Sequence, residues 1–434
     1  MIDQVARSAT SAQDAHRIAQ VGGTNGLFVV RQPMAWAGTR AARDQVFTGL
    51  ARSVELLAHA ARSAGGFLAP TAVGLSARPA VFGGDTHVFE VLTPVEQEVF
   101  CNLLRSKVPV LIAMAGRGTT AANSPRDRIG SRWLTSSRSH LASRFVASTT
   151  PEHLERVKAE LRRRDGVARL DRMDVVPDQA FDNGLSVTVR CIDAAASLAV
   201  TRAHMIVLAA LGLRARRMVR DGKRIGHSPQ RQLEENRARA VADGLRARFT
   251  LEDRTGRPRQ GQTKQVRQVE GRAAVRELLL DLCPEFGNLD VAVEELMPVV
   301  LPVELPRLGL RRFSTEADLL ASWAAGGESA LVRAAGDELR NPVPGGFLLA
   351  QATQAAPGRT SVVMDLWRAN IAGERKDNTQ RQGRDKDKRG ERAHRGERTG
   401  GRHHRSDSGS RGDRAQSTHR GGDRRGGRDR DGNA

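Results

Sequence analysis

Residues 182–193 read DNGLSVTVRCID, and residues 232–245 read QLEENRARAVADGL. In the first segment Val187, Val189 and Cys191 alternate with polar side chains, so we predict a strand with one apolar face. Asp193 ends this strand, and its side chain favours the N-cap position of a helix that follows. Arg190 follows Val189, so we expect its side chain on the opposite face, where a ligand could lie.

The residues between these two segments predict two helices. Apolar side chains recur at near-helical spacing from Ala194 to Arg220, and the basic end suits a helix C-terminus. A second helix is predicted from Ser228 to Asp243, with Gly244 ending it. The central unit is therefore a strand followed by two helices.

This unit resembles the carboxylate–amine ligase family, which includes the type 2 glutamate–cysteine ligases. The family pattern has a strand ending in Thr-Val-Glu-Val-Arg-x-x-Asp, a long helix, and then a helix with Asn-Arg and Arg-Tyr-Gly-Leu. Arg190 and Asp193 match the end of the strand, and Asn236 and Arg237 match the second helix. Thr188 stands where the family has glutamate, and Ala242-Asp243 replace the Arg-Tyr pair.

The resemblance extends toward the N-terminus. Residues 21–33 read VGGTNGLFVVRQP and are similar to the first strand of the family, with Thr24-Asn-Gly26 in place of an acidic triplet. His87, on a strand expected within residues 80–92, matches the first histidine of a family His-Val-His-Val-Gly motif, and Phe89 replaces the second. A lone strand histidine is more often structural than catalytic. Arg132 lies in a polar loop that echoes a family loop ending in arginine, and a solvated basic loop is the alternative interpretation.

The resemblance implies an α+β fold of the glutamine-synthetase type, a curved antiparallel sheet with helices packed on one side. It also implies a reaction in which ATP phosphorylates a carboxylate and an amine displaces the phosphate. By this resemblance the catalytic candidates are Arg190, Asp193 and His87. The cofactor-binding candidates are Arg132, Asn236 and Arg237.

The family chemistry needs ATP and Mg²⁺, and hard divalent cations prefer carboxylate oxygens. The neutral residues at positions 24–26 and 188 cannot supply them, so we predict no metal ligands. We therefore expect a degenerate, non-catalytic or weakly active homologue that binds a small carboxylate or acts as a scaffold. An active ligase is the alternative, and it requires Asp85, Glu90 or Asp193 to substitute for the missing acids. Nucleic-acid association is the third hypothesis.

Composition bears on compartment and partners. The net charge is +20 and the pI about 11.3, which makes anionic partners plausible on physical grounds. No apolar run approaches the ~18 residues of a membrane span. Three cysteines, Cys101, Cys191 and Cys283, have apolar neighbours and indicate buried thiols in a reducing compartment. We predict a cytoplasmic protein that does not enter a membrane.

Four regions follow from these patterns. Residues 1–20 are a polar lead, residues 21–297 form the ligase-like domain, and residues 298–373 are a helical extension that begins with a proline-punctuated linker at 298–312. Residues 374–434 hold 19 Lys or Arg and 11 Asp or Glu, a balance of +8, with almost no apolar residue. Such a tract cannot bury enough apolar surface to offset chain entropy, so we predict a disordered tail.

The tail should bind RNA or DNA through phosphates alone, because no aromatic residue interleaves its arginines and glycines. We expect log affinity to fall linearly with log salt concentration and to be similar for polyU and mixed-sequence RNA. Truncation at Gly373 should remove most of the binding in a fluorescence anisotropy titration. Equal binding by the truncated chain would instead assign the interaction to basic residues 126–144 or 214–224.

Overall fold

The computed structural model describes residues 18–20, 28–30, 35–68, 84–115, 148–165, 173–179, 184–225, 229–252, 266–310, 322–323 and 325–373. All of them lie in one compact unit, Met1–Thr379. The predicted disordered tail, 374–434, lies outside the described residues.

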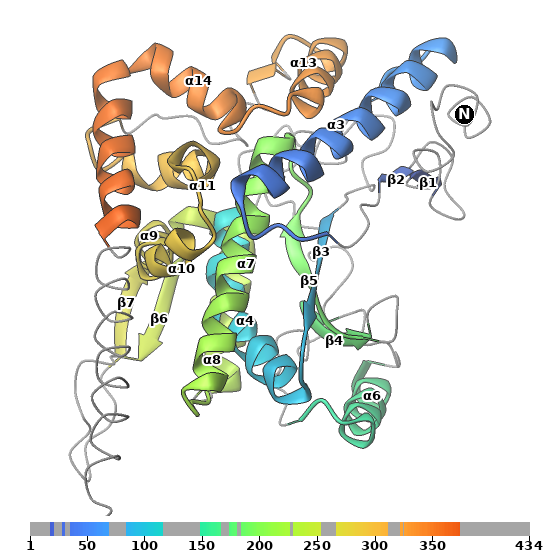
Figure 1. The fold of residues 1–434 in the computed structure, drawn as a ribbon, viewed down its shortest axis with the longest axis vertical. Coiled ribbons are helices and arrows are strands. Elements are labelled where there is room, and N and C mark those ends of the chain that lie inside the picture. Colours follow the sequence, from blue (N-terminus) through green and yellow to red (C-terminus); the bar gives the residue numbers. More distant parts are fainter. Residues whose placement is uncertain are drawn as a thin grey trace, which may run out of the picture. The chain divides into compact units, whose positions relative to one another are not determined.

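The described strands form three small antiparallel sheets (Figure 1). The central sheet has the order β3-β5-β4, with β3 at Gly84–Val91, β5 at Leu185–Asp193 and β4 at Val175–Gln179. β1 (Ile18–Gln20) pairs with β2 (Phe28–Val30), and β6 (Arg248–Glu252) pairs with β7 (Val266–Glu270). The mixed helix-and-strand prediction is confirmed, while the described strands form separate sheets of two, three and two strands.

Helices make up most of the described structure. They are α3 (Arg40–Ser63), α4 (Pro94–Ala115), α6 (Pro151–Asp165), α7 (Leu198–Arg220), α8 (Gln230–Asp243), η3 (Gly244–Arg246), α9 (Gly271–Asp281), α10 (Cys283–Asn288), α11 (Val293–Glu304), α13 (Glu328–Arg340), α14 (Gly346–Ala355) and residues 357–373. The predicted helices at 194–220 and 228–243 are thus present within a few residues of their expected bounds.

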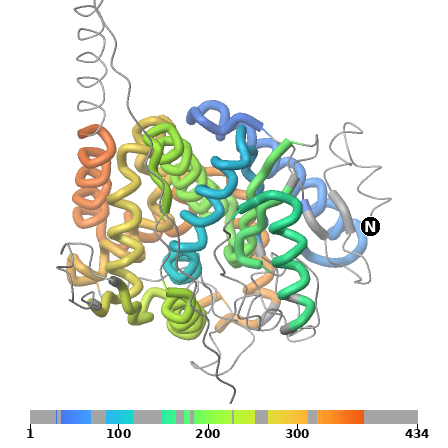
Figure 2. Tube along the Cα trace, turned by 90° about the horizontal axis from the view of Figure 1, so that it is seen from below, coloured from blue at the N-terminus to red at the C-terminus, as the bar shows by residue number. Residues whose placement is uncertain are grey.

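α4 and α7 lie side by side and cover one face of the central sheet (Figures 1 and 2). Val187, Val189 and Cys191 of β5 are fully buried in the same cluster as both helices. Phe89 of β3 meets Phe100 of α4 edge-on, with ring centroids 5.9 Å apart. The apolar side chains that alternate along β5, as predicted, therefore line one side of the main core.

α7 is the central helix of this core. Among the described helices it is the one long and apolar enough to cross a membrane, but 67% of its apolar window is buried inside the protein. That packing is typical of the core helix of a soluble protein. The three cysteines are free and buried, as predicted.

The predicted N-cap role of Asp193 is wrong. Asp193 is the last residue of β5, paired with Gly84, and α7 begins five residues later at Leu198. Its N-cap is Ser197, whose Oγ accepts a hydrogen bond from the Val200 N–H at 3.3 Å. Three small buried alanines, 194–196, carry the chain from the strand to this serine.

The prediction of a linker at 298–312 is also wrong for residues 298–304, which belong to α11. Pro298 and Pro302 lie inside α11, where every residue but Glu294 is buried. An internal proline costs a helix about 3 kcal/mol, yet α11 buries seven large apolar side chains, and each contributes about 1.5–3 kcal/mol. Burial therefore outweighs local propensity.

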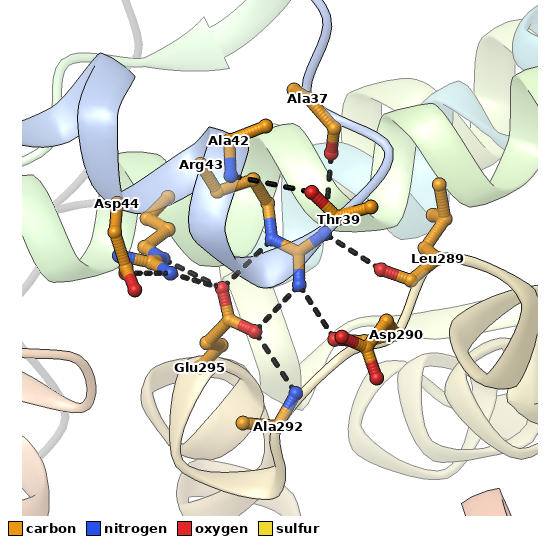
Figure 3. Close-up of polar contacts among 10 residues, drawn as sticks. Ala37, Thr39, Ala42, Arg43, Asp44, Leu289, Asp290, Ala292 and Glu295 are labelled. Atoms are coloured by element: carbon orange, nitrogen blue, oxygen red, sulfur yellow. Dashed lines mark hydrogen bonds and ion pairs between the residues drawn. The ribbon is translucent and has the colours of Figure 1, made fainter.

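A buried ionic cluster joins three helices that are far apart in the sequence (Figure 3). Glu295 of α11 is fully buried and accepts from Arg43 Nε at 2.8 Å and Nη2 at 2.7 Å. Arg202 of α7 donates from Nε to the same carboxylate at 2.7 Å and pairs with Asp44 at 2.7 Å. Arg43 also donates to the carbonyl oxygens of Leu289 and Asp290 at 2.7 and 3.0 Å. Two buried cations are thus balanced by two carboxylates.

The cluster sets the charge state of its centre. Burial alone would raise the pKa of the Glu295 carboxyl, but the hydrogen bonds and charge of Arg43, the Ala292 N–H and the charge of Arg202 outweigh burial and lower it below 4.5. A carboxyl whose pKa is lower in the folded protein stabilises it above the unfolded pKa. This contribution is present at neutral pH and is lost as the pH falls below about 4.5.

We expect Glu295→Ala to lower the free energy of unfolding by about 3–5 kcal/mol, because it leaves Arg43 and Arg202 buried without their shared counter-ion. Urea denaturation followed by circular dichroism measures this loss. Glu294→Ala is the matched control, since the Glu294 side chain is 36% exposed and pairs with Arg368 at 3.5 Å. It should cost less than about 1 kcal/mol. Equal losses in the two variants would contradict a central role for the cluster.

Candidate functional site

The strand register places two catalytic candidates on opposite faces of the central sheet. His87 of β3 is directly opposite Val189 of β5, so both side chains lie on the face covered by α4 and α7, called here the inner face. Arg190 is the next residue along β5, and its side chain lies on the other face, the outer face. The sheet therefore does not bring Arg190 and His87 to one reaction centre.

His87 is part of the buried inner face. Its side chain is only 8% exposed, and its Nε2 has no hydrogen-bond partner among the described residues. Burial lowers the pKa of the His87 imidazole below 6.5, and the nearby charge of Asp85 opposes this only in part. Asp85 itself accepts from Thr201 Oγ1 at 2.9 Å and from the Ala195 N–H at 3.4 Å, so it anchors the start of α7.

The outer face carries a different set of side chains. Ser186 of β5 is paired with Glu90 of β3 on one side and with Asp178 of β4 on the other. Two residues along β5, Thr188 is paired in the same way with Val88 and Val176. Ser186 and Thr188 are buried, Arg190 is half-buried, and the two acids are exposed. In the part of the chain that the structure describes, Ser186 Oγ and Arg190 Nε have no hydrogen-bond partner. α6 covers one edge of this face, where Val157 packs against Val176.

The cofactor-binding candidates on α8 have structural partners. Arg237 forms a two-bond pair with Asp174, at 2.7 Å from Nε and 3.0 Å from Nη2, and Asp174 is fully buried. Asn236 bonds Thr250 of β6 twice, donating to its carbonyl oxygen at 2.7 Å and accepting from its N–H at 2.9 Å. Arg237 thus fixes α8 to the start of β4, and Asn236 fixes it to β6.

Asp174 connects Arg237 to Arg190 through the backbone. The Arg190 N–H donates to the Asp174 carbonyl oxygen at 2.8 Å, while the Asp174 carboxylate binds Arg237. The two arginines are therefore near the same strand end, but only Arg237 is neutralised by this acid. Asp193 is buried at the end of β5, and Arg132 and residues 24–26 lie outside the described residues.

The donor set does not fit a magnesium–nucleotide centre. No group of three or more His, Cys, Asp or Glu side chains that could hold a metal ion occurs among the described residues. Thr188 occupies the outer-face position where the ligase resemblance expects a glutamate. What the outer face offers is the guanidinium of Arg190, on the same face of β5 as the buried hydroxyl groups of Thr188 and Ser186, two and four residues away.

Sequence reasoning did not identify Asp174, Asp178 or Ser186 as parts of this region. Their relation to Arg190 and Arg237 depends on the β3-β5-β4 register, which no single strand reveals. The alternation of β5 did predict that the side chains of Arg190 and Val189 lie on opposite faces of the sheet.

No protein-family model and no curated protein matches this chain. The ligase resemblance therefore rests on the motifs quoted above.

We expect His87 to make the protein less stable in mild acid. Below about pH 6.5 the unfolded imidazole takes up a proton that the buried one does not, so stability falls by up to about 1.4 kcal/mol per pH unit. His87→Gln should show a shallower fall between about pH 7 and pH 5 in urea titrations. His59→Gln, at an exposed site on α3, is the control and should keep the wild-type slope.

Proposed function

We propose that this protein is a non-catalytic relative of the carboxylate–amine ligases that binds a small carboxylate or phosphate anion on the outer face. The observation that carries the proposal is Arg190, a half-buried cation whose Nε lacks a partner among the described residues. A glutamine-synthetase-like fold belongs to the same proposal, supported by the order strand, long helix and second helix in β5, α7 and α8.

The chemistry of the outer face favours an anion. A guanidinium presents parallel N–H donors that match carboxylate or phosphate oxygens. Partial burial strengthens such a pair, because less water screens it. Ser186 and Thr188 project from the same face of β5, and the unpartnered Ser186 hydroxyl can donate a further hydrogen bond.

The same face argues against the ligase reaction. Transfer of a phosphoryl group depends on divalent cations that neutralise the developing charge. Glu90 and Asp178 are the acids nearest to Ser186 in the register, but they are separated by two strand spacings, roughly 9–10 Å between backbones. Two exposed acids at this distance are a weak substitute for a magnesium cluster.

Isothermal titration of the full-length protein tests the proposal. L-glutamate, inorganic phosphate, ATP alone and ATP with Mg²⁺ are titrated separately, and ADP release is measured in parallel. We expect anion binding that does not require Mg²⁺ and no glutamate-dependent ADP release. Robust Mg²⁺-dependent ADP release that Glu90→Gln abolishes would establish the active-ligase alternative.

Two arginine variants separate ligand binding from folding. Arg190→Gln should weaken anion binding at least about tenfold, the loss of a charged hydrogen bond, with little change in melting temperature. Arg237→Gln leaves the fully buried Asp174 without its ion pair and should cost about 3–5 kcal/mol of stability. Unchanged anion affinity in a folded Arg190→Gln protein would falsify the assignment of the ligand to the outer face.

A further inference from the structure

A dense group of cations lies where α7 ends and the chain turns toward α8. Arg216, Arg217 and Arg220 are on the last turns of α7, and Lys223 and Arg224 follow directly. The exposed fractions of Arg220, Lys223 and Arg224 are 76%, 67% and 71%. Arg216 and Arg217 are 47% and 39% exposed. These five residues are called here the α7 basic surface.

Two acids of this region, Glu285 and Glu96, are buried beneath the cations. Glu285 of α10 is 2% exposed and pairs with both Arg214 and Arg217. Glu96 of α4 is 7% exposed and accepts from Arg216 Nε at 2.8 Å. Because the carboxylates are buried and the guanidinium groups are outside them, positive charge faces the solvent. The inner arginines are also held in place, which reduces the entropy lost when they bind a ligand.

The most exposed cations have the weakest partners. Arg220 and Lys223 share Asp221 at 3.7 and 3.4 Å, and Arg224 is 3.9 Å from Glu98. With Arg214, Arg216 and Arg217 this makes six cations against the four acids Asp221, Glu96, Glu98 and Glu285, a local balance of +2. Exposed ion pairs at these distances contribute little, so the cations can exchange their partners for a stronger anion.

The surface suits a polyanion better than a membrane. Binding to a bilayer surface uses apolar side chains that enter the headgroup region. Most large apolar residues found exposed in the described chain are remote in sequence from this surface, for example Trp36 and Phe67, and none lies between Arg214 and Arg224. Leu92 and Val95 are the exposed apolar residues next to Glu96, the partner of Arg216. The segment 214–224 also contains no aromatic residue that could stack on a base. Its chemistry therefore matches repeated phosphates without base recognition.

We propose that the α7 basic surface binds the phosphate backbone of nucleic acid, without sequence preference and independently of the anion site on the outer face. The surface belongs to the folded unit, so it contributes binding in addition to any from residues 374–434. Its inner arginines, Arg216 and Arg217, are held by buried acids, whereas the anion site uses Arg190 on the sheet.

The test uses the full-length chain with Arg220→Gln, Lys223→Gln and Arg224→Gln combined. These three side chains are mostly exposed, so circular dichroism and melting temperature should stay at the wild-type values. The matched control combines Arg62→Gln, Arg163→Gln and Arg368→Gln, which removes the same charge from α3, α6 and residues 357–373. Fluorescence anisotropy with a labelled single-stranded RNA and a labelled DNA duplex is recorded over a salt series.

We expect the α7 variant to lose about tenfold or more in affinity at ~50 mM salt, and its log–log salt slope to become shallower by about 2 on single-stranded RNA. The control variant should lose less than about threefold. Equal losses in both variants would show that net charge alone matters, and no loss in either would leave the binding to other residues; each result overturns the proposal. Loss of sedimentation with phosphatidylserine vesicles, at unchanged RNA affinity, would overturn the choice of partner.

Discussion

The carboxylate of Glu295 is the interaction on which the described structure most depends. It is fully buried and is held between Arg43 and Arg202, which come from helices that are 252 and 93 residues away in the sequence. Buried charges are costly unless every one is paired, so the three side chains tolerate only a narrow relative placement of α3, α7 and α11. Phe47 adds to this constraint, because the Arg202 guanidinium lies 5.5 Å from its ring centroid.

Contacts between α7 and a carboxylate of another element recur along the helix. Near its start, Asp85 accepts from Thr201; in its first half, Arg202 binds Glu295; and toward its end, Arg214 and Arg217 bind Glu285. Each contact pairs α7 with a different element, and in the last two the carboxylate is buried. α7 is consequently fixed in rotation, with one apolar side on the sheet and its basic end turned to the solvent. The position of the α7 basic surface follows from the way in which the core is held.

Local patterns predicted the elements, and long-range contacts decided their roles. The helical period of α7 and the alternation of β5 lie within short windows, so the sequence alone identified them. The choice of Ser197 over Asp193 as N-cap depended on where three alanines could be buried, and the helix at Pro298 and Pro302 depended on a core that surrounds it. The separation of His87 from Arg190 required the register between β3 and β5. A sequence motif does not reveal the register between two strands. The motifs could therefore suggest His87 and Arg190 as catalytic residues, but they could not show that the two side chains lie on opposite faces of the sheet.

The fate of each arginine is decided by whether a buried acid lies within reach. Arg43, Arg202 and Arg237 have such an acid and serve the fold. Arg190 lies near the same strand end as Arg237, yet the Asp174 carboxylate binds Arg237 on α8, and it is the Asp174 carbonyl oxygen that accepts from the Arg190 N–H. The charge of Arg190 is therefore not neutralised by a buried carboxylate in the described structure, and Arg220, Lys223 and Arg224 are only loosely paired with exposed or half-buried acids. In a chain with a net charge of +20, these weakly paired cations separate the two proposed binding surfaces from the structural arginines Arg43, Arg202 and Arg237.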